Sequence, residues 1–178
     1  MNNPTWKNDI TGNGKENQIL GKTGCAITEE SSVISSALGK EITPQDINDD
    51  KNNFVEDTDL LDMQKVAEDN GLEFDYWTRE KQGNLSKKIF ELSEADTGYF
   101  ISAQVAYNSD ESLHWVGVEE IEKRINGKSY VKIEPSSSYD TDKNNRTRKS
   151  WVLDKNGDMW VDTSDIKKIY TYTTKKNK

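Results

Sequence analysis

The 178-residue chain has few side chains suited to covalent cross-links or metal sites, because it contains one cysteine and one histidine. A single cysteine excludes an intramolecular disulfide and leaves the redox compartment open. A zinc site would need two carboxylates beside these two residues, which is a poor match to the usual ligand sets. The sequence therefore implies no metal and no organic cofactor.

Long apolar runs are also missing. Hydrophobic residues make up 32% of the chain, and no run approaches the length of a membrane span, so we expect no membrane insertion. The first nine residues lack a basic start followed by an apolar core, so we expect synthesis in the cytoplasm without a signal peptide. The formal net charge of -8 argues against nucleic acid as a partner, because binding to phosphates depends on clustered lysine and arginine.

The hydrophobic pattern predicts an α+β fold with helices in the first half and antiparallel strands in the second. Residues 1–17 form a polar arm, residues 18–174 form one domain, and residues 175–178 form a basic tail. We expect helices from Cys25 to a stop at Gly39, from Pro44 after a Thr43 cap, from a Thr58 or Asp59 cap to Asn70-Gly71, and over 85–92. We expect a strand or an extended connector over 72–77, and strands over 99–106, 113–121, 129–134, 150–153, 159–161 and 169–172.

Cys25 and His114 stand in contexts that suit a nucleophile and its base. Cys25 falls in the first turn of its predicted helix, where unpaired N–H groups and the helix dipole stabilise a thiolate. His114 lies at the start of the apolar segment 113–118, which predicts a strand. In a purely structural interpretation Cys25 is a small core residue, His114 is a packing residue, and residues 28–32 form a solvated helix face.

A cysteine hydrolase also needs a group that orients the base and donors for the oxyanion. The Gln18 amide lies upstream of Cys25 and can join the backbone N–H of Cys25 as the second oxyanion donor. Glu134 ends the strand that follows His114, so antiparallel pairing would bring its carboxylate toward the imidazole; Asp140 or a nearby asparagine is the alternative. The predicted catalytic set is therefore Cys25, His114, Glu134 and Gln18.

The order glutamine, cysteine, histidine and acid resembles the papain-like cysteine peptidase superfamily. More narrowly, the segments at Gln18, 24–28, 42–48, 114–116 and 133–135 resemble the bacteriocin-leader-peptidase-like family of bacteria and their phages. The chain departs from that family with Glu134-Pro135 in place of Asp-Pro, and with the glutamine one residue further from the cysteine. The resemblance implies a papain-like fold, in which N-terminal helices pack on a C-terminal antiparallel sheet, and catalysis through a thioester.

These features predict a monomeric papain-like cysteine peptidase or amidase. Its expected substrate is a peptide, or the stem peptide of peptidoglycan as for a phage endolysin that is released to the cell wall. Two alternatives stay open: an inactive binding module on the same fold, and a structural protein stabilised by calcium. The calcium alternative rests on residues 46–50 and 154–158, which alternate oxygen side chains but lack the glycine at the sixth position of an EF-hand loop.

Overall fold

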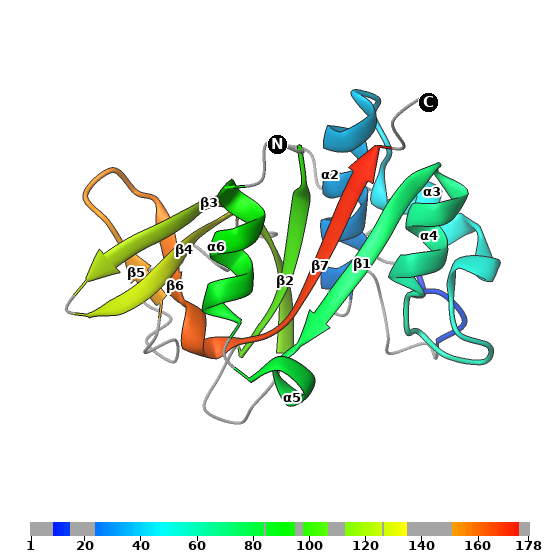
Figure 1. Ribbon diagram of the computed structural model, residues 1–178. Helices are drawn as coiled ribbons and strands as arrows, with labels where there is room; N and C mark the ends of the chain where they lie inside the picture. The colour runs from blue at the N-terminus through cyan, green and yellow to red at the C-terminus, as the bar shows by residue number, and fades with distance from the viewer. Residues whose placement is uncertain are drawn as a thin grey trace.

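The computed structural model describes residues 9–14, 24–83, 85–94, 98–106, 113–125, 127–134 and 151–174. These residues form one seven-stranded antiparallel sheet with helices on both of its faces (Figure 1), so the α+β class is confirmed. The helices are α2 (Cys25–Leu38), α3 (Pro44–Asp49), η2 (Lys51–Asn53), α4 (Met63–Asp69), α5 (Arg79–Gln82), α6 (Ser86–Glu94) and η3 (Thr163–Asp165). The strands are β1 (Leu72–Thr78), β2 (Phe100–Ala106), β3 (Leu113–Ile125), β4 (Lys128–Glu134), β5 (Trp151–Leu153), β6 (Met159–Asp162) and β7 (Ile166–Thr174).

The strand order β1-β7-β2-β3-β4-β6-β5 places the last strand of the chain between the two strands that come first. β1 comes from the first half of the chain and pairs along its whole length with β7, from Leu72 opposite Thr174 to Thr78 opposite Lys168. The prediction was a sheet formed by the C-terminal part of the chain. The sheet also includes β1 from the first half.

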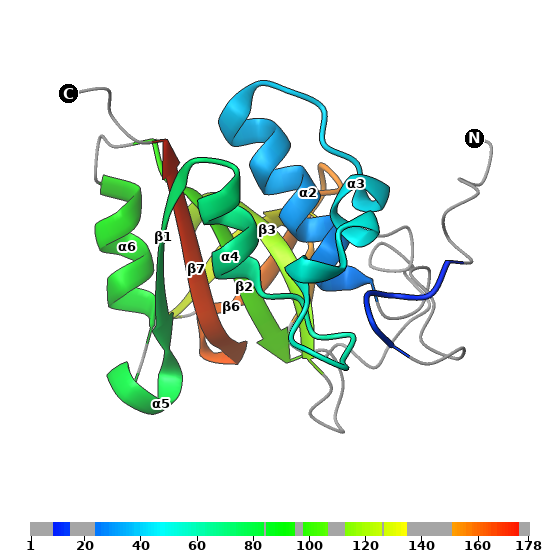
Figure 2. The same cartoon turned by 90° about the vertical axis from the view of Figure 1, so that its right-hand side faces the viewer.

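Helices cover both faces of the sheet (Figure 2). α2 and α4 lie on one face with α3 beside them, and α6 lies on the other. β3 supplies side chains to both faces in alternation: Trp115 packs on the α2 side, whereas Val116 and Val118 pack on the α6 side. The N-terminal helices thus pack on one face of the sheet, and α6 packs on the opposite face.

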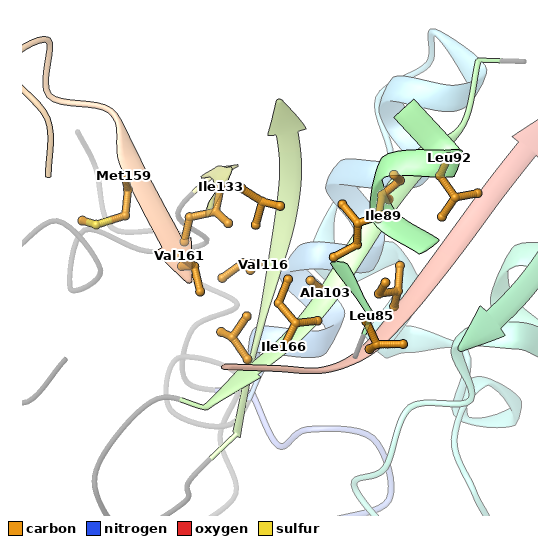
Figure 3. Close-up of a cluster of buried hydrophobic side chains, with 13 residues drawn as sticks. Leu85, Ile89, Leu92, Ala103, Val116, Ile133, Met159, Val161 and Ile166 are labelled. Atoms are coloured by element: carbon orange, nitrogen blue, oxygen red, sulfur yellow. The ribbon is translucent and has the colours of Figure 1, made fainter. Parts of the chain in front are cut away.

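The core on the α6 side is aliphatic (Figure 3). Leu85, Ile89 and Leu92 recur at helical spacing and project onto side chains of the sheet. The sheet residues of this cluster are Ile101, Ala103, Val105, Val116, Val131, Ile133, Met159, Val161, Ile166 and Ile169.

The core on the α2 side contains more aromatic and polar groups. Ile27, Val33 and Ile34 of α2 pack in one cluster with Trp115 and Tyr172 of the sheet. Tyr172 is fully buried, so its hydroxyl needs a partner inside the protein. This face of the sheet carries the candidate site.

Two helix ends predicted from sequence are present. Gly39 follows α2 in the left-handed conformation with φ 60°, which glycine adopts without steric cost. Thr43 and Asp46 form a capping box on α3: Thr43 Oγ1 accepts from the Asp46 N–H at 3.1 Å, and Asp46 Oδ2 accepts from the Thr43 N–H at 2.7 Å. These motifs specify the helix boundaries locally.

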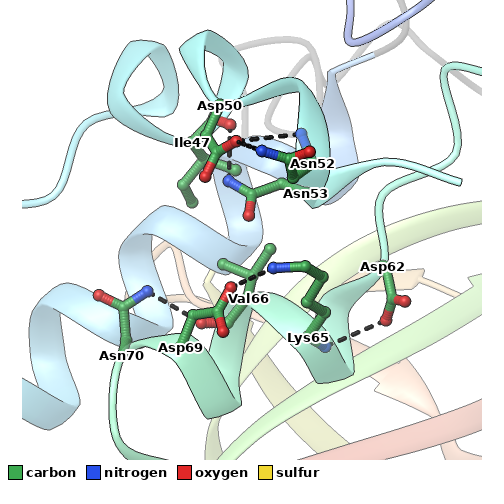
Figure 4. Close-up of polar contacts among 9 residues, drawn as sticks. All are labelled: Ile47, Asp50, Asn52, Asn53, Asp62, Lys65, Val66, Asp69 and Asn70. Atoms are coloured by element: carbon green, nitrogen blue, oxygen red, sulfur yellow. Dashed lines mark hydrogen bonds and ion pairs between the residues drawn. The ribbon is translucent and has the colours of Figure 1, made fainter. Parts of the chain in front are cut away.

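The predicted start of α4 is wrong. The helix begins at Met63, where the carboxylate of Asp62 accepts from the N–H of Lys65 at 3.0 Å (Figure 4). Thr58 instead closes a turn, in which its hydroxyl donates to the Val55 carbonyl at 2.7 Å. Hydroxyl and carboxylate side chains cap either a helix or a turn, so two candidates in sequence cannot be ranked by residue type alone.

Part of the predicted N-terminal arm is docked on the body of the protein. The Gly12 N–H donates to Asn48 Oδ1 at 2.7 Å, and Asn48 Nδ2 donates to the Ile10 carbonyl at 3.1 Å. Gly12 has a φ of 54°, and a Cβ at this position would lie 2.3 Å from Cδ1 of Phe54. Only glycine therefore fits there. Across the described part of the chain, we find no helix that is both long and apolar enough to span a membrane.

Candidate active site

Cys25 is the first residue of α2, as predicted. Its N-cap is Gly24, which has no side chain to accept from the first-turn N–H groups. The thiol is partly buried, and the backbone N–H groups of Ala26 and Trp115 form hydrogen bonds to it. One donor comes from the helix and the other from β3, so the packing of α2 on the sheet fixes the position of the sulfur.

His114 lies next to Cys25, because β3 begins beside the N-terminus of α2. Burial raises the pKa of the Cys25 thiol, but a hydrogen bond with the His114 side chain, the attraction of its positive charge and the two backbone N–H groups outweigh burial. The pKa of Cys25 is consequently lowered below its ordinary value. On β5, the Trp151 ring lies with its centroid 6.5 Å from that of His114.

Glu29 lies one helical turn after Cys25 and is buried, with 3% of its surface exposed. Its Oε1 accepts from the Ser102 hydroxyl at 2.8 Å, and the backbone of Gly117 forms a second hydrogen bond to the carboxylate. Burial, and to a smaller extent the negative charge of Glu134, raise the pKa of Glu29 to about 7, against the opposing effects of Ser102, His114 and Gly117. A buried carboxyl that titrates near neutral pH thus lies beside the Cys25–His114 pair.

Gly117 gives the Glu29 carboxylate room to lie flat on the sheet. A Cβ at position 117 would approach Glu29 Oε1 to 3.2 Å and Oε2 to 3.5 Å. Ser102 is the cross-strand partner of Gly117 on β2, so the donor and the open backbone stand side by side beneath the carboxylate. The three residues form one packing unit between α2 and the sheet.

A second buried carboxyl follows immediately in the chain. Glu30 has no exposed surface, and its Oε2 accepts from the Tyr172 hydroxyl at 2.6 Å. Its Oε1 has no hydrogen-bond partner among the described residues. Burial raises the pKa of Glu30 well above its ordinary value. A hydrogen bond between Ser102 and Tyr172 connects Glu30 to Glu29.

Glu134, predicted to orient the histidine, lies opposite Gly117 rather than opposite His114. The three residue steps from His114 to Gly117 along β3 correspond to about 10 Å at the rise of a strand. Glu134 is exposed, and its negative charge raises the pKa of Glu29 beyond the effect of burial. Gln18 and the alternative orienting residue Asp140 lie outside the described residues.

A cavity of about 380 Å³ lies between α2 and strands β2 to β4, on the side of Glu29 away from Cys25. Apolar walls come from Val33, Phe100 and Val118, among others. The polar lining consists of three carboxyl groups and three hydroxyls, from Glu29, Glu119, Glu134, Ser32, Ser36 and Tyr99. The cavity is therefore lined by carboxyl groups, of which Glu29 has a pKa raised by burial to about 7 and Glu119 is paired with Lys132 at 3.0 Å.

The acidic loops considered for calcium use their carboxylates in local turns and caps. Asp46 caps α3, and Asp50 Oδ1 accepts from the backbone N–H of Asn52 at 3.0 Å (Figure 4). Asp154 Oδ1 accepts from the N–H of Asn156 at 2.8 Å and of Asp158 at 3.1 Å. Within the described ranges no group of three or more potential metal-ligating side chains gathers.

The sequence interpretation missed Glu29, Ser102 and Trp151 as neighbours of the pair. Residues 28–32 were a solvated face in the structural interpretation, yet Glu29, Glu30 and Ser31 are buried. Helical spacing did place Glu29 on the same face as Cys25, four residues away, and this was the available signal.

A search against models of protein families and a search of curated proteins both find no match for this chain. The functional argument therefore depends on the residues of the site.

Proposed function

We propose that the chain is a papain-like cysteine hydrolase that cleaves a peptide or amide bond through a thioester on Cys25. The observation that carries this proposal is the hydrogen bond between Cys25 and His114 at an N-terminus of a helix, with a lowered thiol pKa. A structural cysteine in apolar surroundings has its pKa raised instead. A nucleophilic cysteine needs a lowered thiol pKa, because the thiolate is the form that attacks.

In the first half of the reaction, the Cys25 thiolate attacks the carbonyl carbon of the scissile bond. The carbonyl π electrons move to oxygen, and the backbone N–H of Cys25 donates to the resulting oxyanion. The intermediate collapses as the C–N bond breaks, and the His114 imidazolium gives its proton to the leaving amine. A thioester and a neutral imidazole remain.

In the second half, His114 takes a proton from water while the water oxygen attacks the thioester carbon. The C–S bond breaks, which releases a carboxylic acid and restores the thiolate beside the imidazolium. The Trp151 ring lies near the imidazole, tilted by 32° against it.

The finer part of the proposal is a peptidoglycan stem peptide as substrate, as for a phage endolysin acting at the cell wall. The carboxyl groups of the cavity beyond Glu29 suit a substrate that carries amines, which stem peptides contain. Zymography on cell walls tests this part. Clearing by the wild type and none by Cys25→Ala would support it, whereas hydrolysis of general peptide substrates without clearing would restrict the proposal to proteolysis.

Alkylation of Cys25 by iodoacetamide over pH 5 to 9 tests the pair itself. The chain has one cysteine, so the mass gained by the intact protein reports one site without background. We expect rapid labelling at pH 6, slowed about tenfold or more by His114→Ala because the thiol then loses its imidazole partner. Glu119→Gln, a change in the cavity on the side away from the thiol, is the matched control and should leave the rate within about twofold.

Slow labelling at pH 6 that is the same in wild type and His114→Ala would contradict the catalytic proposal. The position of Glu134, opposite Gly117 and not His114, favours one alternative, a binding module that has kept the fold and lost the chemistry. Rapid labelling together with wall binding, but with no release of peptide fragments or amines, would support that alternative.

A further inference from the structure

The cavity between α2 and strands β2 to β4 becomes more buried from its rim to its floor. At the rim Ser36, Tyr99 and Glu134 are exposed, whereas Glu29 and Gly117 at the floor are buried. Glu29 is the one buried side chain of this lining that can carry a charge. The volume of about 380 Å³ lies within the range of pockets that hold small ligands, roughly 300–1,000 Å³. A buried ionisable group at the floor distinguishes this cavity from the apolar voids that stay dry.

The polar groups on the α2 wall of the cavity have few partners within the protein. Glu29 accepts from the Ser102 hydroxyl at 2.8 Å, but no lysine or arginine of the described chain forms an ion pair with it. Ser32 and Ser36 follow Glu29 by three and seven residues, so all three lie on one side of the helix. The two hydroxyls form no hydrogen bond among the described residues. One carboxyl and two hydroxyls are thus available to a ligand.

Apolar side chains stand next to these polar groups. Val33 is buried and Phe100 is half-buried, and both belong to the cluster on the α2 face of the sheet. Methylene groups of a ligand can pack against them while its charged end reaches Glu29. At the rim, Glu119 is already neutralised by Lys132 at 3.0 Å, which leaves Glu29 as the buried carboxyl without a counter-ion. The lining therefore suits a ligand with an aliphatic chain and a positively charged end.

We propose that this cavity binds a primary ammonium group on an aliphatic chain, as in a lysine side chain, with Glu29 as its counter-ion. An ammonium has three donors, and the carboxyl of Glu29 and the hydroxyls of Ser32 and Ser36 are acceptors for them. This inference goes beyond the proposed function, because it requires neither a nucleophile nor a base. The bound group lies on the side of Glu29 away from Cys25. A free amine and a lysine residue of a peptide share this chemistry.

The charge of Glu29 makes binding depend on pH. Burial raises the pKa of Glu29 to about 7. The titratable groups that face it are Glu30 of α2, His114 of β3, Glu134 of β4 and Tyr172 of β7. Of these groups, only the histidine favours the ionised form of Glu29. An ammonium adds a second positive charge, so it binds more tightly at pH 7.5, where Glu29 is mostly ionised, than at pH 5.5.

NMR titration of the isotope-labelled protein tests the proposal with two probes that differ in one group. Nα-acetyl-lysine amide carries the ammonium, and Nα-acetyl-norleucine amide has the same four-carbon chain without it. At pH 7.5 we expect the lysine probe to bind with a dissociation constant of ~1 mM and to shift the amide signals of Ser32 and Gly117. The norleucine probe at pH 7.5, and the lysine probe at pH 5.5, should each bind about tenfold more weakly.

Two substitutions inside the cavity and one outside it assign the site. Glu29→Gln removes the counter-ion and should weaken binding of the lysine probe about tenfold or more. Ser32→Leu fills the cavity from α2 and should have a similar effect, which provides a second test in case Glu29→Gln does not fold. The control is Glu91→Gln, which changes the net charge equally at an exposed position of α6, on the other face of the sheet. It should leave the affinity within about twofold.

Equal binding of the two probes, or no binding of the lysine probe, would overturn the proposal. An affinity that stays within about twofold of the wild type in both Glu29→Gln and Ser32→Leu would also overturn it. Cys25→Ala should bind the lysine probe as the wild type does, so failure of the proposed function leaves this result unchanged. Inhibition of peptide hydrolysis by the lysine probe alone would assign the ammonium to the substrate, and binding without inhibition would assign it to a separate small molecule.

Discussion

Burial of Glu29 should make the stability of this protein depend on pH in a way that one isosteric substitution removes. Glu29→Gln keeps an acceptor for Ser102 and Gly117 but cannot ionise. The comparison of the two proteins therefore reports the Glu29 carboxyl together with its effect on Glu30, whose pKa the charge of Glu29 raises further after burial. Glu30 is present in both proteins and contributes to both.

The sign follows from the raised pKa. Below pH 4.5 the carboxyl is protonated in both the folded and the unfolded chain. Between pH 4.5 and about 7 the unfolded chain loses this proton while the folded chain keeps it, so the free energy of unfolding falls as pH rises. Above about pH 7 the carboxyl is ionised in both states, and the difference between the two proteins becomes constant.

The magnitude comes from the same pKa. A rise from 4.5 to about 7 corresponds to about 3 kcal/mol at about 1.4 kcal/mol per pH unit. The free energy of unfolding of the wild type, relative to Glu29→Gln, should fall by about 3 kcal/mol across this window. Most of that change should be visible between pH 5 and pH 7.

Urea unfolding followed by tryptophan fluorescence at pH 5, 6, 7 and 8 measures this difference, and the five tryptophans provide the signal. Glu119→Gln is the control, because it removes a carboxylate of the same cavity that is exposed and paired with Lys132 at 3.0 Å. Its difference from the wild type should stay within about 0.5 kcal/mol at every pH. Parallel plots of the free energy of unfolding against pH for the wild type and Glu29→Gln would refute the reasoning. The Glu29 carboxyl would then have the same pKa in the folded and the unfolded chain, and it could not be buried as described.

Three further substitutions test the packing of the protein by the same urea measurement. Gly12→Ala should cost about 3 kcal/mol, because a Cβ would lie 2.3 Å from Phe54 Cδ1 at a φ of 54°, whereas Gly39→Ala, at a φ of 60° in open space, should cost about 1 kcal/mol. Equal costs for the two glycines would show that the N-terminal arm is not docked on Phe54. Tyr172→Phe should cost about 2 kcal/mol, because Glu30 Oε2 loses its 2.6 Å hydrogen bond inside the protein, and a cost below about 0.5 kcal/mol would contradict that contact.

Features encoded by neighbouring residues were predictable from the sequence. The capping box of Thr43 and Asp46, the stop of α2 at Gly39 and the position of Cys25 in a first helical turn depend on a few adjacent side chains. The strands β2, β4 and β6 were also recognised from short apolar segments bounded by turns. Local chemistry decides such features, so a single sequence is sufficient to find them.

Features that depend on distant partners were not predictable. The burial of Glu29 and Glu30 requires Ser102 and Tyr172, which lie 73 and 142 residues further along the chain. From the sequence alone the two glutamates are interpreted as part of a polar helix face, because no neighbouring residue in the sequence indicates a hydrogen-bond partner for a buried carboxyl. The placement of Glu134 opposite Gly117 likewise depends on the register of β3 and β4, and residue order alone did not indicate it.

The position of β7 between β1 and β2 has a consequence for the order in which the chain can assemble. During synthesis α2 and β1 leave the ribosome long before β7 exists, so β1 must wait without its partner strand. Contacts between residues so far apart in sequence slow folding, because the intervening loop must close first. Tyr172 arrives with the same late strand, and Glu30 has no hydroxyl donor until then. The hydrogen bond between Tyr172 and Glu30 on the α2 side of the sheet therefore forms only after β7 has joined β1 and β2.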